Sequence, residues 1–231
     1  MLEINGLCTG YRPQVDVLHD VAMTVEDGGF VAILGANGAG KTTLARSISG
    51  VLKPRSGSIS LHGSTLPSDP EKVSRLGISH VPEARGVFGG LSIRENLHLG
   101  AYSLRDRHIL SEREERVYAM FPILKDRRQQ QAGTLSGGQQ QMLAVGRGLM
   151  SDPKILIVDE PSLGLAPNLV EGVMETLEAL NENGVTIILI EQNAIALEFA
   201  RWCYVLRGGR VVAHDTAAAL ANNDVLRDSY L

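Results

Sequence analysis

The sequence predicts an α/β fold in which a mainly parallel central sheet is covered by helices. Three short runs, Phe30–Leu34, Ile155–Val158 and Val185–Ile190, are apolar throughout apart from Thr186, and a strand that is apolar on both faces suits the middle of a parallel sheet. Each run is followed by a polar loop and a segment compatible with a helix, such as Asn168–Leu180. Buried strands that alternate with helices indicate an α/β layered architecture.

Runs of another kind at the N-terminal end predict further strands. Leu2–Leu7 alternates apolar and polar residues, and Val17–Val25 does so loosely, which is typical of strands with one buried face. The dipeptide Asp27-Gly28 then precedes Phe30–Leu34, and Asp-Gly between two apolar runs favours a tight turn. The sequence therefore predicts a hairpin that joins Val17–Val25 to Phe30–Leu34.

A glycine-rich segment with the pattern G-x-x-x-x-G-K-[ST] follows the first apolar run, between Gly35 and Thr42. Small residues allow successive backbone N–H groups to surround phosphate oxygens, and the start of the next helix adds unpaired amides. We expect Lys41 to bridge the β- and γ-phosphates of a nucleoside triphosphate and the Thr42 hydroxyl to ligate magnesium. The predicted nucleotide-binding residues of this segment are Asn37, Gly38, Ala39, Gly40, Lys41, Thr42 and Thr43.

The middle of the chain predicts helices, because Leu91–Met150 contains no run typical of a strand. Ser92 and Glu95 have the spacing of a capping box, which predicts a helix that begins after Ser92. The segment Ser111–Glu114 has the composition of an acidic first turn and predicts the start of another helix. We interpret residues 86–151 as a helical insert within the α/β domain.

The second apolar run ends in two acidic residues, Asp159 and Glu160. Both carboxylates are thereby placed at the carboxyl end of a buried strand, where ligands bind in open α/β sheets. We expect Asp159 to hold magnesium through water, and Glu160 to orient and polarise the water that attacks the γ-phosphate.

The C-terminal end predicts structural elements only. Gly208-Gly209 between two arginines indicates a hairpin turn. Asp215–Ala221 predicts a short helix.

Length and composition exclude several classes of protein. A chain of 231 residues with 44% hydrophobic and 21% charged residues is typical of a folded domain. A net charge of −4 argues against nucleic acid as a partner. The longest apolar runs are far shorter than the roughly 20 residues of a membrane-spanning helix, and no secretory signal is visible, so we expect a cytoplasmic chain.

The segment Leu135-Ser136-Gly137-Gly138-Gln139 lies between the glycine-rich loop and the acidic strand. Ser136 can cap a helix, Gln139 can return the capping bond, and the two glycines leave backbone amides open to an anion. In this order and at this spacing, the three motifs resemble those of the ATP-binding-cassette (ABC) ATPases, and the resemblance covers essentially the whole chain.

The resemblance implies a P-loop NTPase fold of the ABC ATPase type. This fold has a mainly parallel central sheet, an N-terminal antiparallel β subdomain and a helical insert. The chain would then be a single ABC ATPase domain, residues 1–231, with a helical subdomain at about 86–151.

The resemblance also implies that two such subunits pair and enclose two molecules of ATP head to tail. Lys41 and Glu160 would serve the subunit's own ATP and Mg²⁺, and Tyr11 would stack on the adenine. The loop Ser162–Pro167 would lie at the contact between subunits, and the helical insert would dock on a membrane-embedded partner. The motif residues that would contact the partner's ATP are Ser136, Gly137, Gly138 and Gln139.

Two positions depart from the family's usual pattern. Glu83 stands where the family has a glutamine that senses magnesium, and Gln192 stands where it has a histidine that contacts the γ-phosphate. An amide can still donate a hydrogen bond to phosphate, but it does not titrate near neutral pH. Glu83 adds a negative charge, which is acceptable if Glu83 ligates the metal and costly if it does not. We assign Gln192 to the catalytic residues and Glu83 to the magnesium ligands on this basis.

With these two residues, the sequence resembles a narrower group within the family, the ATPase subunits of bacterial branched-chain amino-acid importers. The resemblance rests on five segments: Val81-Pro82-Glu83, the short capped helix within Val87–Leu97, Leu135–Arg147, Asp159–Pro167 and Ile190–Asn193. In this group two non-identical ATPases pair beneath two membrane permease subunits, and an external solute-binding protein delivers the cargo. The implied function is ATP hydrolysis that powers the uptake of branched-chain (hydrophobic) amino acids, by a peripheral subunit on the cytoplasmic face of the inner membrane.

Three other functions remain open at this point. The same role could serve urea or short-chain amides. An ABC ATPase that acts on nucleic acid or ribosomes usually carries two cassettes or a long insertion, for which this chain has no room. A non-hydrolytic regulatory module is suggested by Glu83 and Gln192, but the intact Lys41, Asp159 and Glu160 count against it.

Overall fold

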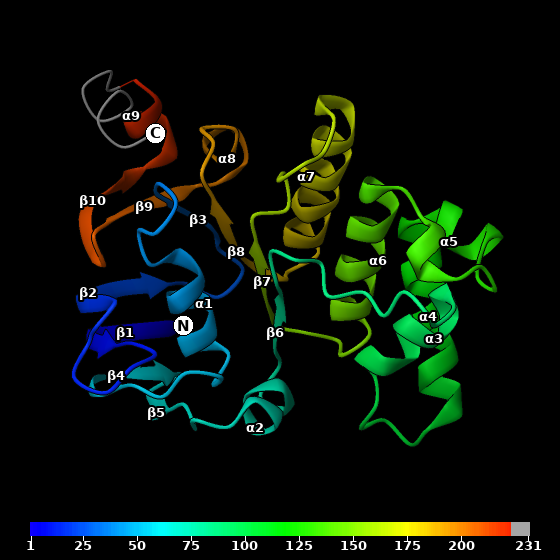
Figure 1. The fold of residues 1–231 in the computed structure, drawn as a ribbon, viewed down its shortest axis with the longest axis horizontal. Coiled ribbons are helices and arrows are strands. Elements are labelled where there is room, and N and C mark those ends of the chain that lie inside the picture. Colours follow the sequence, from blue (N-terminus) through cyan, green and yellow to red (C-terminus); the bar gives the residue numbers. More distant parts are fainter. Residues whose placement is uncertain (223–231) are drawn as a thin grey trace.

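The computed structural model describes residues 1–222, which form two sheets and the helices around them (Figure 1). The strands are β1 (Leu2–Thr9), β2 (Leu18–Val25), β3 (Phe30–Leu34), β4 (Ser56–Leu61), β5 (Ser64–Thr65), β6 (Ile78–Val81), β7 (Ile155–Asp159), β8 (Thr186–Glu191), β9 (Trp202–Arg207) and β10 (Arg210–Thr216). The helices are α1 (Lys41–Ile48), α2 (Pro70–Arg75), α3 (Ile93–Gly100), α4 (Arg107–Met120), α5 (Pro122–Asp126), α6 (Gly137–Leu149), α7 (Pro167–Glu182), α8 (Ala196–Phe199) and α9 (Ala217–Ala221), with a 3₁₀ turn at Ala132–Thr134. Within residues 1–222, no helix is long and apolar enough to cross a bilayer.

The central sheet has six strands in the order β10-β9-β3-β8-β7-β6. Every pair from β9 to β6 is parallel, and β10 alone runs antiparallel, as the second strand of a hairpin with β9. All residues of β3, β7 and β8 are buried, as expected for interior strands of a parallel sheet. The predicted α/β fold with a mainly parallel central sheet is confirmed.

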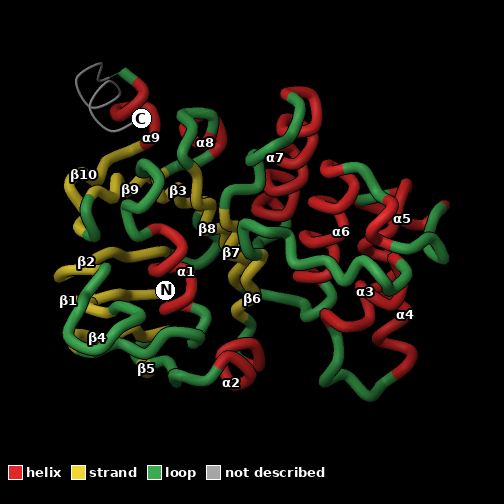
Figure 2. The backbone as a smooth tube through the Cα atoms, in the orientation of Figure 1, coloured by secondary structure: helices red, strands yellow, loops and turns green. Residues whose placement is uncertain are grey.

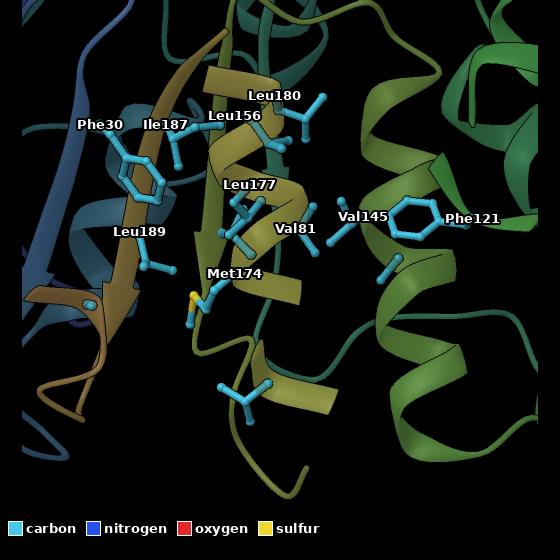
Figure 3. Close-up of a cluster of buried hydrophobic side chains, with 14 of the residues drawn as sticks. Phe30, Val81, Phe121, Val145, Leu156, Met174, Leu177, Leu180, Ile187 and Leu189 are labelled. Carbon is cyan, nitrogen blue, oxygen red and sulfur yellow. The ribbon is translucent and has the colours of Figure 1, made fainter. Parts of the chain in front are cut away.

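The central sheet separates two hydrophobic cores, and alternate residues of each interior strand contribute to opposite cores. In β8, Ile188 and Ile190 pack toward α1 and the N-terminal strands. Ile187 and Leu189 point to the other side, where they meet Leu177 of α7 (Figure 3). A strand with both faces covered requires a continuous apolar sequence, which explains the pattern of the three runs.

The second sheet is antiparallel, in the order β2-β1-β4-β5, and forms the predicted N-terminal β subdomain. The predicted hairpin between Val17–Val25 and Phe30–Leu34 is wrong. The turn at Asp27-Gly28 joins β2 of this sheet to β3 of the central sheet, where β3 pairs with β8 and β9. Because β3 is buried on both faces, pairing at the centre of the parallel sheet outweighs the local preference for a tight hairpin.

The helical insert consists of α3 to α6, which follow β6 in sequence and gather on one side of the strands (Figure 2). The predicted capping box at α3 is confirmed, since the Ser92 hydroxyl accepts from the Glu95 N–H and the Glu95 carboxylate accepts from the Ser92 N–H at 2.7 Å. The predicted helix start at Ser111 is wrong. Helix α4 begins at Arg107, because the Asp106 carboxylate accepts two amide hydrogen bonds there and caps the helix one turn earlier.

Candidate functional site

The glycine-rich loop connects the carboxyl end of β3 to the first turn of α1 (Figure 1). Gly40 adopts a left-handed φ of 106° directly before the helix, a conformation that residues with a Cβ rarely adopt. At Gly35, an added Cβ would lie 2.3 Å from the Leu206 carbonyl oxygen. The glycines are therefore required for the loop to turn and to pack against β9.

Lys41 is held by three oxygens at the start of α1. Its ammonium donates to the Gly35 carbonyl at 2.7 Å and to the Ala36 carbonyl at 3.2 Å, and it pairs with the Glu160 carboxylate at 2.9 Å. The Lys41 and Glu160 side chains are only 3% and 8% exposed. Two residues far apart in the sequence, which follow the carboxyl ends of β3 and β7, thus form one buried ion pair.

A cavity of about 320 Å³ brings together half of the predicted site residues. Its walls come from the glycine-rich loop, from the first turn of α1, from the end of β7 and from the segment after β6. The lining residues are Val17, Asn37, Gly38, Gly40, Lys41, Thr42, Thr43, Glu83 and Glu160. The predicted loop residue Ala39 is instead buried, at 6% exposure.

A larger cavity, of about 800 Å³, lies at the amino ends of β7 and β8. It contains none of the predicted nucleotide or magnesium residues. Size alone therefore does not locate the site, and we assign it from the converging charged groups.

Asp159 is the most deeply buried acidic group beside this cavity. Its carboxylate oxygens are buried without a hydrogen-bond partner of good geometry. Burial raises the pKa of Asp159 from 3.8 to about 6; Thr42 and Lys41 oppose this rise, while Glu160 and Glu83 add to it. An unpaired buried carboxylate beside a hydroxyl fits a magnesium ion, whose other ligands would be water and nucleotide phosphates.

The raised pKa of Asp159 predicts a pH dependence of stability. In the absence of divalent ions the folded chain binds this proton more tightly than the unfolded chain. The contribution of Asp159 to the free energy of unfolding should therefore fall by roughly 2 kcal/mol as the pH rises from about 4 to about 6. Urea unfolding in EDTA across this range measures the slope for the unmodified protein and for Asp159→Asn, and the difference between the two should equal this contribution. An equal slope in both proteins would show that Asp159 is not its source.

Glu160 follows Asp159 with a left-handed φ of 47°. Its backbone N–H donates to the Ile190 carbonyl of β8 at 2.8 Å, and this bond helps to maintain a conformation that costs a non-glycine residue about 1 kcal/mol or more. The turn directs the carboxylate toward Lys41 and the cavity. A carboxylate so placed can accept a proton from water bound there.

Glu191, at the end of β8, belongs to the site, although the sequence motifs do not predict it. It is 1% exposed, and its carboxylate accepts from the Ser162 N–H at 3.0 Å and from the Gln192 N–H at 3.2 Å. Burial raises the pKa of Glu191, and the hydrogen bonds from Ser162 and Gln192 oppose this rise. A carboxylate that directly continues an apolar strand was the one signal that could have found it.

Gln192 itself is half-buried after β8. Its side chain is not among those that line the cavity of about 320 Å³. The structure thus places Gln192 beside Glu191 and the loop after Glu160, and does not bring it into the group formed by Lys41, Glu83 and Glu160.

Tyr11 lies in the loop between β1 and β2 and is 53% exposed. Its hydroxyl accepts hydrogen bonds from Arg46 at 3.1 Å and from the Thr43 hydroxyl at 3.4 Å. The Arg46 guanidinium lies 5.6 Å from the centre of the ring. The structure thus places Tyr11 on the outer side of α1, next to a predicted nucleotide-binding residue.

Ser136 caps α6, and the predicted return bond from Gln139 is present. The Ser136 hydroxyl accepts from the Gln139 N–H at 3.4 Å, and the Gln139 side chain accepts from the Ser136 N–H at 3.2 Å. Helices α6 and α1 lie on opposite sides of β6, β7 and β8 (Figure 1). The residues Ser136, Gly137, Gly138 and Gln139 therefore form a second group, separate from the cavity beside Lys41.

Comparisons with known proteins agree with the predicted resemblance. The chain is similar to the high-affinity branched-chain amino acid transport ATP-binding protein BraG of Pseudomonas aeruginosa, with 46% identity over 100% of this chain and 99% of that protein. It is also similar to a probable branched-chain amino acid transport ATP-binding protein, LivF, of Archaeoglobus fulgidus, with 35% identity over 97% of this chain and 95% of that protein. Among solved structures, it matches an ATP binding subunit of an ABC transporter with a TM-score of 0.84 and 30% identity, over 100% of this chain and 95% of that chain.

A family model provides independent evidence. The model described as "ABC transporter" matches residues 18–163, which is more than half of the chain and includes both the glycine-rich loop and the acidic strand. The predicted ABC resemblance and the predicted P-loop NTPase fold are confirmed by these matches. The chain belongs to the ABC transporter family.

Proposed function

We propose that this chain is the ATP-binding and ATP-hydrolysing subunit of a bacterial ABC importer for branched-chain amino acids. The observation that carries the hydrolytic half of this proposal is the buried Lys41–Glu160 ion pair in the cavity beside Asp159. One cation for the phosphates, one carboxylate for water and one unpaired carboxylate for magnesium meet there. This is the set of groups that hydrolysis of a nucleoside triphosphate requires.

In the proposed mechanism, Lys41 exchanges its carboxylate and carbonyl partners for oxygens of the β- and γ-phosphates. Glu160 is then released to hold a water molecule, whose oxygen attacks the γ-phosphorus as the bond to the β-phosphate oxygen breaks. Magnesium, when bound through Thr42, Asp159 and Glu83, would neutralise phosphate charge. The Glu160 carboxylate accepts hydrogen bonds from the water and so orients it, and it takes up the proton that the water loses as it attacks.

The separation of the two groups of site residues supports a second ATPase subunit as a partner. Ser136, Gly137, Gly138 and Gln139 lie away from the cavity that contains Lys41, which suits a role toward the ATP of a second subunit. We propose pairing with a second, non-identical ABC ATPase, with Tyr11 stacking on adenine and Gln192 contacting the γ-phosphate. Residues 1–231 would form one ABC ATPase domain with a helical subdomain at about 86–151; residues 223–231 lie outside the described part.

The proposed cargo rests on the similarity to BraG and LivF, whose names refer to branched-chain amino acid transport. The subunit would work at the cytoplasmic face of the inner membrane, beneath two permease subunits that receive solute from an external binding protein. The helical insert, which gathers on one side of the molecule (Figure 2), would dock on the permeases.

The experiment that tests this function measures phosphate release by the assembled transporter in lipid vesicles. Leucine, isoleucine or valine, each with the binding protein, is expected to stimulate magnesium-dependent ATP hydrolysis, and the same complex with Glu160→Gln is the matched control. Stimulation by urea or acetamide alone would contradict the amino-acid cargo. No phosphate release under any condition would contradict the hydrolytic function.

A further inference from the structure

The segment that follows Glu83 makes a tight turn with an unusual backbone. Arg85 and Gly86 both have a left-handed φ of 59°. Glycine adopts this conformation without strain, but arginine rarely does. Two consecutive residues of this kind turn the backbone sharply, and neighbouring contacts must maintain the turn.

Arg147 of α6 provides those contacts. Its guanidinium donates to the Gly86 carbonyl at 2.6 Å and to the Arg85 carbonyl at 3.1 Å, and it lies 5.5 Å from the centre of the Phe88 ring. Two nitrogens of one planar group thus bind consecutive carbonyls, an arrangement that fixes direction as well as position. The turn after Glu83 is therefore attached to the helix that Ser136 caps.

The side chain of Arg85 extends from this turn to the loop Ser162–Pro167. Its guanidinium donates to the Leu163 carbonyl at 3.2 Å, and a Cβ placed on Gly137 would lie 3.3 Å from the same group. Arg85 has no carboxylate partner among the described residues. The absence of a side chain at Gly137 thus makes room for the Arg85 guanidinium. The guanidinium contacts a backbone carbonyl, that of Leu163.

The loop Ser162–Pro167 begins two residues after Glu160 and is held from its other side by Glu191, through the Ser162 N–H. We infer that Arg85 is a positioning residue that fastens this loop to the turn after Glu83, so that the segment entering the helical insert and the loop beside the catalytic carboxylate move together. A displacement of α6 would reach the loop through Arg147 and Arg85. The loop would in turn set the position of Glu160.

This inference deepens the proposed function and rests on it only for the expected effect on hydrolysis. The attachment of the loop Ser162–Pro167 by Arg85 can be tested without nucleotide, by hydrogen–deuterium exchange on the purified chain. Arg85→Gln shortens the side chain, so that it no longer reaches Leu163. Backbone amides of residues 162–166 should then exchange about 3- to 10-fold faster, because their turn loses one of its two side-chain anchors. Arg105→Gln, at an exposed arginine of the same insert, is the matched control and should leave this exchange unchanged.

Kinetics of the assembled transporter provide a second measurement. Arg85→Gln should lower the turnover number by about 5-fold and change the KM for ATP by less than about 2-fold. The substitution leaves the phosphate-binding loop unchanged but loosens the loop Ser162–Pro167 beside Glu160. Unchanged exchange at residues 162–166 would overturn the inference even if the transporter hydrolyses ATP as proposed. Faster exchange spread over the central strands would also overturn it, since Arg85 would then support the fold as a whole. Faster exchange confined to the loop supports the inference even in a chain that hydrolyses no ATP.

Discussion

Glu160→Gln should lower the turnover number for ATP hydrolysis by about 10²- to 10⁴-fold while ATP binding is retained. Glutamine has nearly the same shape as glutamate and can still accept a hydrogen bond from Lys41 through its amide oxygen. It carries no negative charge, however, so it cannot polarise the attacking water or accept its proton. Phosphate release by the assembled transporter and binding of a fluorescent ATP analogue to the variant measure the two effects.

Glu175→Gln is a suitable control for this variant, because Glu175 is an exposed glutamate on α7. The control should hydrolyse ATP at the rate of the unmodified protein. A Glu160→Gln protein with normal turnover would mean that another group positions the water. A variant that loses both binding and turnover would show that Glu160 acts in nucleotide binding, through its ion pair with Lys41.

Lys41→Ala should abolish measurable ATP binding and destabilise the fold by about 3 kcal/mol. The variant removes the cation expected to contact the phosphates. It also leaves the buried Glu160 carboxylate without its partner at 2.9 Å, and the Gly35 carbonyl without its donor. Urea unfolding measures the loss of stability, and the rise in melting temperature on addition of Mg-ATP measures the loss of binding.

The double variant Lys41→Ala/Glu160→Gln separates the two consequences. Because it removes both charges, it should recover much of the lost stability, while ATP binding stays absent. An equal melting-temperature rise with Mg-ATP in Lys41→Ala and in the unmodified protein would refute the phosphate role. A double variant no more stable than Lys41→Ala would show that the unpaired carboxylate is not what destabilises the fold.

The parts of the fold that the sequence predicted are those in which a local pattern has a single physical solution. The run Phe30–Leu34 is apolar on both faces and can be accommodated only in the interior of a covered sheet. The spacing from Gly35 to Thr42 determines a loop that surrounds phosphate. The cap at Ser92 uses atoms three residues apart and needs no tertiary contact.

The errors arose where two local signals competed or where pairing involved distant strands. Asp27-Gly28 favours a hairpin locally, but β3 lies between β8 and β9, which come more than 150 residues later in the chain. Asp106 caps α4 before the acidic turn at Ser111 is reached. The sequence of β6 does not predict a strand, because it contains Ser79 and His80 and its buried apolar residues are only at its two ends.

The sequence alone determined the chemical groups of this protein and the local backbone that presents them: a glycine-rich loop with Lys41 and Thr42, two acids at the end of a buried strand, and a capped helix at Ser136. Only the tertiary structure decided which of these groups meet. In the folded chain Lys41 forms an ion pair with Glu160, and the buried Glu191 accepts a hydrogen bond from the Ser162 N–H. Arg85 donates to the carbonyl of Leu163, 78 residues away. Local patterns determine dihedral angles and hydrophobic faces, whereas a contact between distant side chains depends on how the whole sheet and its helices pack.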